Sequence, residues 1–173
     1  YTATSTPGNI TGTLSQAGDG TIIVTGLANG TGYTFRVTAT NGIGTGAATT
    51  DSDSVTPATV PDAPTITGVL SGNGQATVSF TAPSIDGGSA ITTYTATSTP
   101  GNITGTLSQA GDGTIIVTGL ANGTGYTFRV TATNGIGTGI ASDVSDSVTP
   151  AAPPVDVTST TGRIWMDRNL GAT

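Results

Sequence analysis

Residues 114–134 read TIIVTGLANGTGYTFRVTATN, and an identical copy occupies residues 21–41. In the second half of the stretch every other residue is apolar. The apolar positions are Tyr126, Phe128, Val130 and Ala132, and Thr127, Arg129, Thr131 and Thr133 alternate with them. A period of two is typical of a β-strand with one buried and one solvated face. Ile115, Val117 and Leu120 predict a partner strand, joined by a short turn that Asn and Gly favour.

The pattern GL-x-NGT-x-Y-x-F-x-V-x-A-x-N-x-x-G-x-G in this stretch resembles the E strand, corner and F strand of a fibronectin type III domain. Leu120 followed by Tyr126 is similar to the tyrosine corner, in which the phenol hydroxyl bonds to nearby backbone where the chain crosses between sheets. The resemblance implies an all-β fold of immunoglobulin-like (fibronectin type III) β-sandwich repeats in tandem. It implies structural roles for Phe80, Tyr94, Leu120, Tyr126, Phe128 and Val130.

The chain contains a long internal repeat. Residues 1–46 recur without change as residues 94–139, a period of 94 − 1 = 93 residues. We interpret residues 58–150 as a complete domain of seven strands, with a B strand around Ala76, Val78 and Phe80. Residues 1–57 match only strands C to G. We expect the strands that would complete this first copy to come from sequence before Tyr1 or from another chain.

Composition excludes several kinds of chemistry within these 173 residues. The chain has ten Asp, four Arg and no Cys, His, Lys or Glu, for a net charge of −6. Without Cys or His it lacks disulfides, thiolate nucleophiles and the commonest general base. The negative charge argues against electrostatic binding of nucleic acid. No run of about 20 apolar residues predicts membrane insertion. We therefore predict no enzymatic activity, no cofactor and no metal site.

Residues 151–173 differ in character and hold the only Trp and the only Met. We interpret them as a linker and the start of a following module. The stretch TGRIWMDRNLGAT resembles the opening of the Fibrobacter-type major paralogous domain of Bacteroidota surface and secreted proteins. Trp165 fits the core of that module better than a sugar-stacking role. The linkers TPATVPDAP and TPAAPPVD are Pro-rich, which predicts semi-rigid spacers.

A few polar residues are candidate sites. Ser54 and Ser147 follow Asp and precede Val, a pattern that resembles O-glycosylation sites in Bacteroidota. Acidic residues gather near the domain ends, where calcium binding is an alternative to simple solvation, but their spacing lacks that of a calcium loop. These residues are Asp51, Asp53, Asp143 and Asp146. Arg36 and Arg129 are expected on the outward strand face as isolated surface cations.

These observations predict a non-catalytic structural spacer in a secreted or cell-surface multidomain bacterial protein, where it presents a binding module for adhesion. The expected location is extracellular or at the cell surface. The expected partners are neighbouring repeats of the same longer chain, and surface glycans or proteins bound through a module outside this segment. The alternatives are an accessory segment of an extracellular polysaccharide-degrading enzyme and a segment of a virion fibre.

Overall fold

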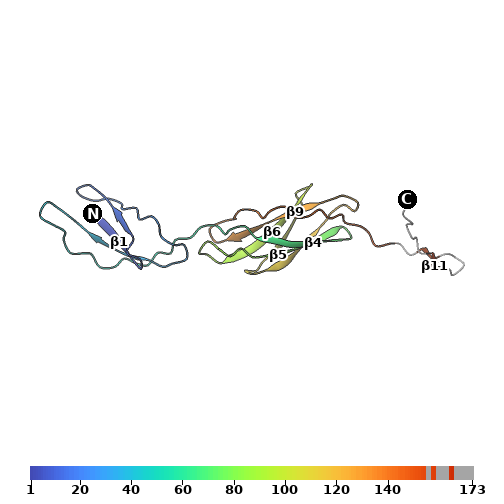
Figure 1. Cartoon of the computed structure of the whole chain (residues 1–173), viewed down its shortest axis with the longest axis horizontal. Helices are drawn as coiled ribbons and strands as arrows, with labels where there is room; N and C mark the ends of the chain where they lie inside the picture. Colours follow the sequence, from blue (N-terminus) through green and yellow to red (C-terminus); the bar gives the residue numbers. More distant parts are fainter. Residues whose placement is uncertain (155–156, 159–163, 166–173) are drawn as a thin grey trace.

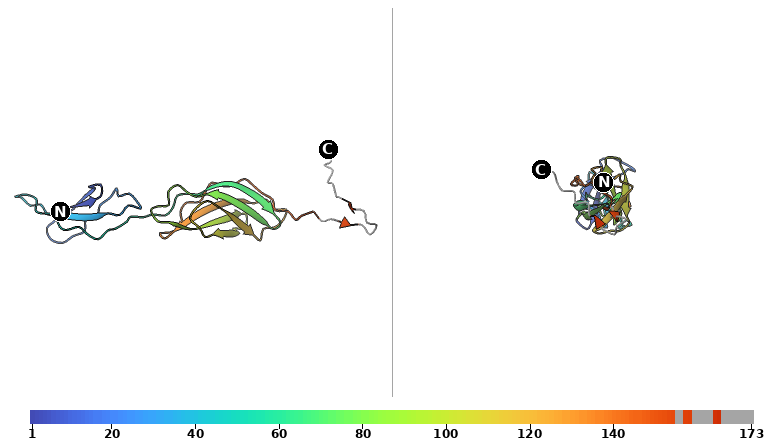
Figure 2. Two further views of the ribbon diagram at one scale, coloured as in Figure 1. Left: turned by 90° about the horizontal axis from the view of Figure 1, so that it is seen from below. Right: turned by 90° about the vertical axis from the view of Figure 1, so that its right-hand side faces the viewer.

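All regular elements in the described part of the chain are β-strands, which confirms the all-β prediction. The structure is a computed structural model that describes residues 1–154, 157–158 and 164–165. Two β units follow one another along the chain and lie end to end, giving an elongated molecule that is narrow when viewed down its long axis (Figures 1 and 2). A short pair, β10 (Val157–Thr158) and β11 (Ile164–Trp165), follows them.

The second unit, which we call the second repeat, contains two antiparallel sheets of three strands each. The first sheet has the order β4-β5-β8, formed by β4 (Thr65–Gly72), β5 (Gln75–Thr81) and β8 (Gly113–Thr118). The second sheet has the order β7-β6-β9, formed by β7 (Thr104–Leu107), β6 (Ile91–Thr99) and β9 (Thr127–Asn134). Their inward faces enclose the core, the arrangement of a sandwich.

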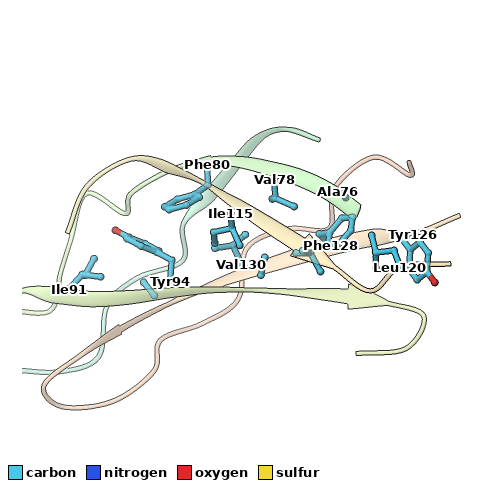
Figure 3. Packing of buried hydrophobic residues seen from close by; sticks show 13 residues of the cluster. Ala76, Val78, Phe80, Ile91, Tyr94, Ile115, Leu120, Tyr126, Phe128 and Val130 are labelled. Atoms are coloured by element: carbon cyan, nitrogen blue, oxygen red, sulfur yellow. The ribbon is translucent and has the colours of Figure 1, made fainter. Parts of the chain in front are cut away.

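The core of the second repeat is built from alternate residues of these strands. β5 and β9 show the alternation most clearly, because every second side chain is buried. Figure 3 shows the ring of Phe80 facing that of Tyr94 between the sheets. The buried set is Ala76, Val78, Phe80, Ile91, Tyr94, Ala96, Ile115, Val117, Leu120, Tyr126, Phe128, Val130 and Ala132. Arg129 is exposed and Thr127 is half-buried, as the sequence pattern predicts.

The prediction that the strand around Ile115 and Val117 is the partner of the following strand is wrong. β8 pairs with β5, placing Ile115 opposite Val78, whereas β9 pairs with β6 in the other sheet. The connection between β8 and β9 therefore crosses from one sheet to the other. A hairpin would have left Leu120 and Tyr126 on one sheet, whereas the crossing lets both side chains close the end of the core.

The expected seventh strand of the second repeat is not a regular strand. Residues 142–148 run beside β9, but they form only one isolated bridge, between Tyr126 and Val148. Side-chain hydroxyls replace part of the backbone ladder, because the amide of Val130 donates to Ser142 Oγ at 3.0 Å and that of Phe128 donates to Ser145 Oγ at 2.9 Å. Serine can compete for backbone groups in this way, which interrupts the strand geometry.

The first unit, which we call the first repeat, forms a single three-stranded sheet. Its order is β2-β1-β3, formed by β1 (Thr2–Thr6), β2 (Thr11–Thr13) and β3 (Thr34–Thr38). These strands are the copies of β6, β7 and β9. Residues 21–26 repeat the sequence of β8 and its flank, yet they belong to no strand in the described structure. In the part of the chain that the structure describes, no strand pairs with them.

Candidate functional site

The six residues given structural roles lie in the core of the second repeat. Tyr94 and Val130 have no exposed surface, and Phe80, Leu120, Tyr126 and Phe128 are also buried. The Phe80 and Tyr94 ring centroids are 4.4 Å apart at an interplanar angle of 44°. The Tyr94 hydroxyl donates to the carbonyl of Ala110 at 3.1 Å. Burial raises the pKa of Tyr94, and the nearby negative charge of Asp112 adds to this effect.

The tyrosine corner is formed in both repeats. The amide of Ala121 donates to the Tyr126 hydroxyl at 3.1 Å, and the amide of Ala28 donates to the Tyr33 hydroxyl at 3.0 Å. In each case the ring is buried while its oxygen meets the backbone five residues earlier. In each repeat the bond ties the connection at Ala28 or Ala121 to the tyrosine that comes just before β3 or β9. This contact is local and needs no residue from β4 or β5, so it survives in the first repeat.

The two candidate modification sites are accessible. Ser54 and Ser147 are both exposed, and each immediately precedes a valine that bonds to the corner tyrosine through the backbone. Val55 pairs with Tyr33 and Val148 pairs with Tyr126. Each serine hydroxyl is therefore presented on an ordered backbone at one end of its repeat. The glycan itself stays a prediction.

The acidic residues near the domain ends do not converge on a common centre. Within the described residues, no group of three metal-ligating side chains is close enough to hold an ion. Asp51 instead pairs with Arg36, whose Nε and Nη2 donate to its two carboxylate oxygens at 2.7 and 2.9 Å. The hydrogen bond from Arg36 holds the pKa of Asp51 below its ordinary value. Such two-point contact is the preferred geometry of an arginine and a carboxylate.

The expectation that Arg36 and Arg129 are isolated surface cations is wrong for Arg36, whereas Arg129 is exposed and has no ion pair within the described residues. Arg36 is paired with Asp51, but the copy of Asp51 in the second repeat is Val144. Arg129 therefore turns to the backbone and donates from Nη1 to the carbonyl of Ser142 at 2.6 Å. The two edges differ at four positions, among them Asp51, whose copy is Val144, and the ion pair of the first repeat gives way to a hydrogen bond to the backbone in the second.

The side chain of Trp165 lies outside what the structure describes, as do residues 166–173. The described backbone places Trp165 opposite Val157 in the β10–β11 pair. The prediction that this residue belongs to the core of a following module therefore stays a prediction.

No helix in the described residues is long and apolar enough to cross a membrane.

The linker between the repeats is bonded to both of them. On the first repeat, the amide of Gly30 donates to the carbonyl of Pro57 at 2.8 Å. On the second repeat, the amide of Thr59 donates to the carbonyl of Gly87 at 2.8 Å. The carbonyl of Thr59 also accepts a hydrogen bond from Asn134 Nδ2 at 2.8 Å. These hydrogen bonds hold Pro57 against the first repeat and Thr59 against the second.

Two glycines bring the repeats into direct backbone contact. Gly30 lies in the turn before β3, and Gly88 lies in the loop between β5 and β6. A Cβ placed on Gly88 would lie 2.7 Å from the Cα of Gly30, closer than real atoms approach. Both glycines have positive φ, 78° and 80°, which glycine adopts without strain. The junction therefore depends on the absence of side chains at both positions.

Sequence reasoning did not find this junction. Gly30 has an identical copy, Gly123, with nearly the same φ of 83°, but no atom of the described residues lies within 4 Å of the Cβ position there. The local sequence around the two glycines is the same, so it carries no signal of the contact. The only available signal is the Gly87-Gly88 pair, which has no copy in residues 1–57.

Comparison with known proteins agrees with the fold. The family model described as Fibronectin type III domain matches residues 60–148, about half of the chain. A crystal structure of domains A168-A170 from titin is 25% identical with a TM-score of 0.51, over 87% of this chain and 54% of that one. That share of the chain is too large for the second repeat alone, so the likeness includes the first repeat.

Two other solved structures are also similar to this chain, one over a smaller share of it and the other at lower sequence identity. A structure of titin kinase and its flanking domains is 29% identical over 54% of this chain and 18% of that one, with a TM-score of 0.43. The chicken CNTN1 FN1-FN3 domains are 17% identical over 87% of this chain and 55% of that one, with a TM-score of 0.47. The chain thus spans at most about half the length of the solved structures it resembles here.

Proposed function

This chain belongs to the fibronectin type III family, and from that premise we propose that it is a non-catalytic spacer segment of a longer multidomain protein. Domains of this family typically serve as structural spacers and are usually non-catalytic modules. The proposed role of this segment is to hold neighbouring modules at a fixed separation and orientation.

The observation that carries this proposal is the junction between the repeats. A flexible linker would leave its backbone groups to water, whereas Pro57 and Thr59 are each bonded to a repeat. Direct packing of Gly30 on Gly88 leaves no room for side chains between the two units. Bonds on both sides of a short Pro-containing linker restrict rotation of one repeat against the other. The segment then behaves as a stiff rod.

We also propose where this spacer segment is located. The resemblance of residues 161–173 to a module of Bacteroidota surface and secreted proteins supports a bacterial protein that is extracellular or located at the cell surface. A stiff rod in that setting would present a binding module for adhesion. Its partners would be neighbouring repeats of the same chain, with glycans or proteins bound through a module outside this segment. The exposed Ser54 and Ser147 are accessible for O-glycosylation in such an environment.

The rod can be tested by measuring the distance between the repeats in solution. The chain has no Cys, so Ser15→Cys and Ser71→Cys introduce the only two attachment points for nitroxide labels. Both serines are exposed, one in each repeat. We expect electron spin resonance to give one narrow distance distribution. A broad distribution in the otherwise unchanged chain would contradict the stiff junction and with it the spacer function.

A matched pair of variants separates the junction from local effects. Gly30→Asn should broaden the distribution, because asparagine tolerates positive φ but its side chain would collide with Gly88. Gly123→Asn places the same change in the identical turn of the second repeat, where the surrounding space is open. We expect no change in the distribution for this control. Equal broadening by both variants would show that the Gly30 contact does not hold the repeats together.

The non-catalytic part of the proposal has its own test. We expect the purified chain to show no turnover of polysaccharide, ester or peptide substrates. Any activity found would be checked with Asp→Asn variants, since aspartates are the only acidic side chains present. Reproducible turnover that is lost in one of these variants would overturn the proposal.

A further inference from the structure

The second repeat has a cleft along one side of its sandwich, which we call the edge cleft. It lies between β4, at the edge of the first sheet, and the segment 142–148 that runs beside β9 in the second sheet. Residues 64–69 line one wall and residues 143–146 line the other. The volume of the cleft is about 310 Å³, at the lower end of the range for ligand-binding pockets.

The two walls of the edge cleft meet beyond each of its ends. At one end the amide of Ala151 donates to the carbonyl of Gly72 at 3.2 Å. At the other end Gly139 lies so close to the carbonyl of Pro61 that a side chain there would overlap it. Between these two points no backbone hydrogen bond joins the walls, among the residues that the structure describes. The cleft is therefore a bounded opening between two chain segments that run in the same direction.

The wall opposite β4 has backbone groups without partners. The amide of Ser145 donates to the carbonyl of Phe128 on β9 at 2.9 Å. The neighbouring amides of Val144 and Asp146 donate no hydrogen bond within the described residues. An open edge of this kind can bind an extended peptide, because the carbonyls of the peptide accept hydrogen bonds from the free amides.

Apolar side chains lie on both walls of the edge cleft. Ile66 and Val69 come from β4, where they are half-buried against the core. Val144 comes from the opposite wall and is 54% exposed. A β-bulge between Ile66 and Gly68 lies within this part of β4, and bulges bend the strand that contains them. The cleft can therefore contact an apolar side chain from two sides.

Two carboxylates flank the exposed valine. Asp143 and Asp146 are both exposed, and neither forms an ion pair within the described residues. The arginine of the adjacent strand, Arg129, is bonded to the carbonyl of Ser142 instead. In a chain with a net charge of −6, these two carboxylates attract a basic ligand and repel an acidic one.

We propose that the edge cleft binds an extended segment of a separate partner protein, in which lysine or arginine alternates with a β-branched apolar residue. Side chains of a strand alternate between two sides, so the apolar ones enter the cleft while the basic ones meet Asp143 and Asp146. The described part of a second copy is a poor ligand, because its two arginines, Arg36 and Arg129, are bonded to their own chain. This binding role is additional to the spacer function and does not depend on the junction between the repeats.

The probe is a fluorescently labelled peptide, Thr-Val-Lys-Val-Lys-Val-Thr, whose anisotropy is measured as the full chain is added. We expect saturable binding. Val144→Arg should weaken it at least about tenfold, because the contact with an apolar side chain is lost and a like charge is added. Ile140→Arg is the control, since Ile140 is 73% exposed, lies outside the cleft lining and receives the same charge. Equal binding by the two variants, or no saturable binding by the unchanged chain, would overturn the proposal.

The basic character of the partner is tested separately. Asp146→Asn should weaken binding about two- to fivefold, the range of an exposed ion pair. Asp53→Asn changes the copy of this residue in the first repeat and should have no effect. A peptide with glutamate in place of both lysines should not bind. Equal binding of the lysine and glutamate peptides, or equal effects of the two aspartate variants, would contradict a basic partner.

Hydrogen exchange followed by NMR tests the contact with the backbone. At saturation the lysine peptide should slow the exchange of the amides of Val144 and Asp146, and leave those of Asp51 and Asp53 in the first repeat unchanged. Unaltered exchange at all four positions would overturn strand addition at this edge. Dimerisation of the unmodified chain, seen by sedimentation and lost in Val144→Arg, would assign the cleft to a second copy and also overturn the proposal.

Discussion

The rings of Phe80 and Tyr94 contact one another across the two sheets of the second repeat, with centroids 4.4 Å apart. Phe80 comes from β5 and Tyr94 from β6, so this contact joins one sheet to the other. Tyr1 is the sequence copy of Tyr94 in the first repeat, has no such neighbour from a second sheet in the described structure and is 38% exposed. The contact therefore marks the difference between a closed sandwich and a single sheet.

Replacement of Phe80 tests the importance of this contact for stability. Phe80→Ala should lower the free energy of unfolding of the second repeat by about 3 to 5 kcal/mol, the usual cost of removing a buried aromatic ring. Hydrogen exchange of residues 65–81 measures it, because these residues have no copy in the first repeat. Leu70→Ala on β4 is the control, since Leu70 is 70% exposed. Similar loss of protection in both variants would mean that the contact between Phe80 and Tyr94 does not stabilise the second repeat.

The stability of the second repeat should fall at alkaline pH because of Tyr94. The folded state raises the pKa of this phenol, whereas in the unfolded chain it titrates near the ordinary value of about 10. As pH rises above about 10, the unfolded state loses its proton first and is favoured, until the folded pKa is passed. Urea unfolding across this range should show that the free energy of unfolding declines less in Tyr94→Phe than in the unchanged chain. Tyr1→Phe should retain the full decline, and an equal decline in all three proteins would contradict the assignment.

The corner hydroxyl should make a modest contribution to stability in each repeat. Tyr126→Phe removes the acceptor for the amide of Ala121, which should cost about 0.5 to 1.5 kcal/mol. The urea midpoint measures this change, with exchange of residues 65–81 identifying the second repeat. Tyr33→Phe removes the equivalent bond at 3.0 Å in the first repeat and should leave those residues unchanged. An unaltered midpoint for Tyr126→Phe would show that the hydroxyl does not support the corner.

The ion pair at the edge of the first repeat should be visible in the titration of Asp51. Its folded pKa is lowered by the hydrogen bond from Arg36, so the pair supports the fold above the unfolded pKa and loses this effect as pH falls through the folded pKa. Carboxyl chemical shifts measured by NMR should show the pKa of Asp51 rising towards its ordinary value in Arg36→Gln. Arg129→Gln should leave it unchanged, because Arg129 bonds to Ser142 instead. A shift of Asp51 in the Arg129 variant would contradict this pairing.

The sequence by itself determined the strand class, the repeat and the side of β9 that faces the core. Alternation at Tyr126, Phe128 and Val130 allows one register, because a shift by one residue would bury Arg129 and expose the apolar side chains. The local tyrosine corner was also predictable, since both of its partners lie within six residues. What could not be predicted was the partner of β8, the irregular edge at residues 142–148 and the contact between Gly30 and Gly88.

The tertiary structure decided these points because they depend on neighbours that are distant in the sequence. Val24 and Val117 stand in identical local sequences, yet one lines an open groove and the other is fully buried. Gly30 and Gly123 share a turn conformation, but only Gly30 meets another repeat. A strand edge is satisfied or left open by a second chain segment, and burial requires a second surface. Identical sequence therefore fixes what each element can form, whereas the surrounding segments fix which contacts it makes.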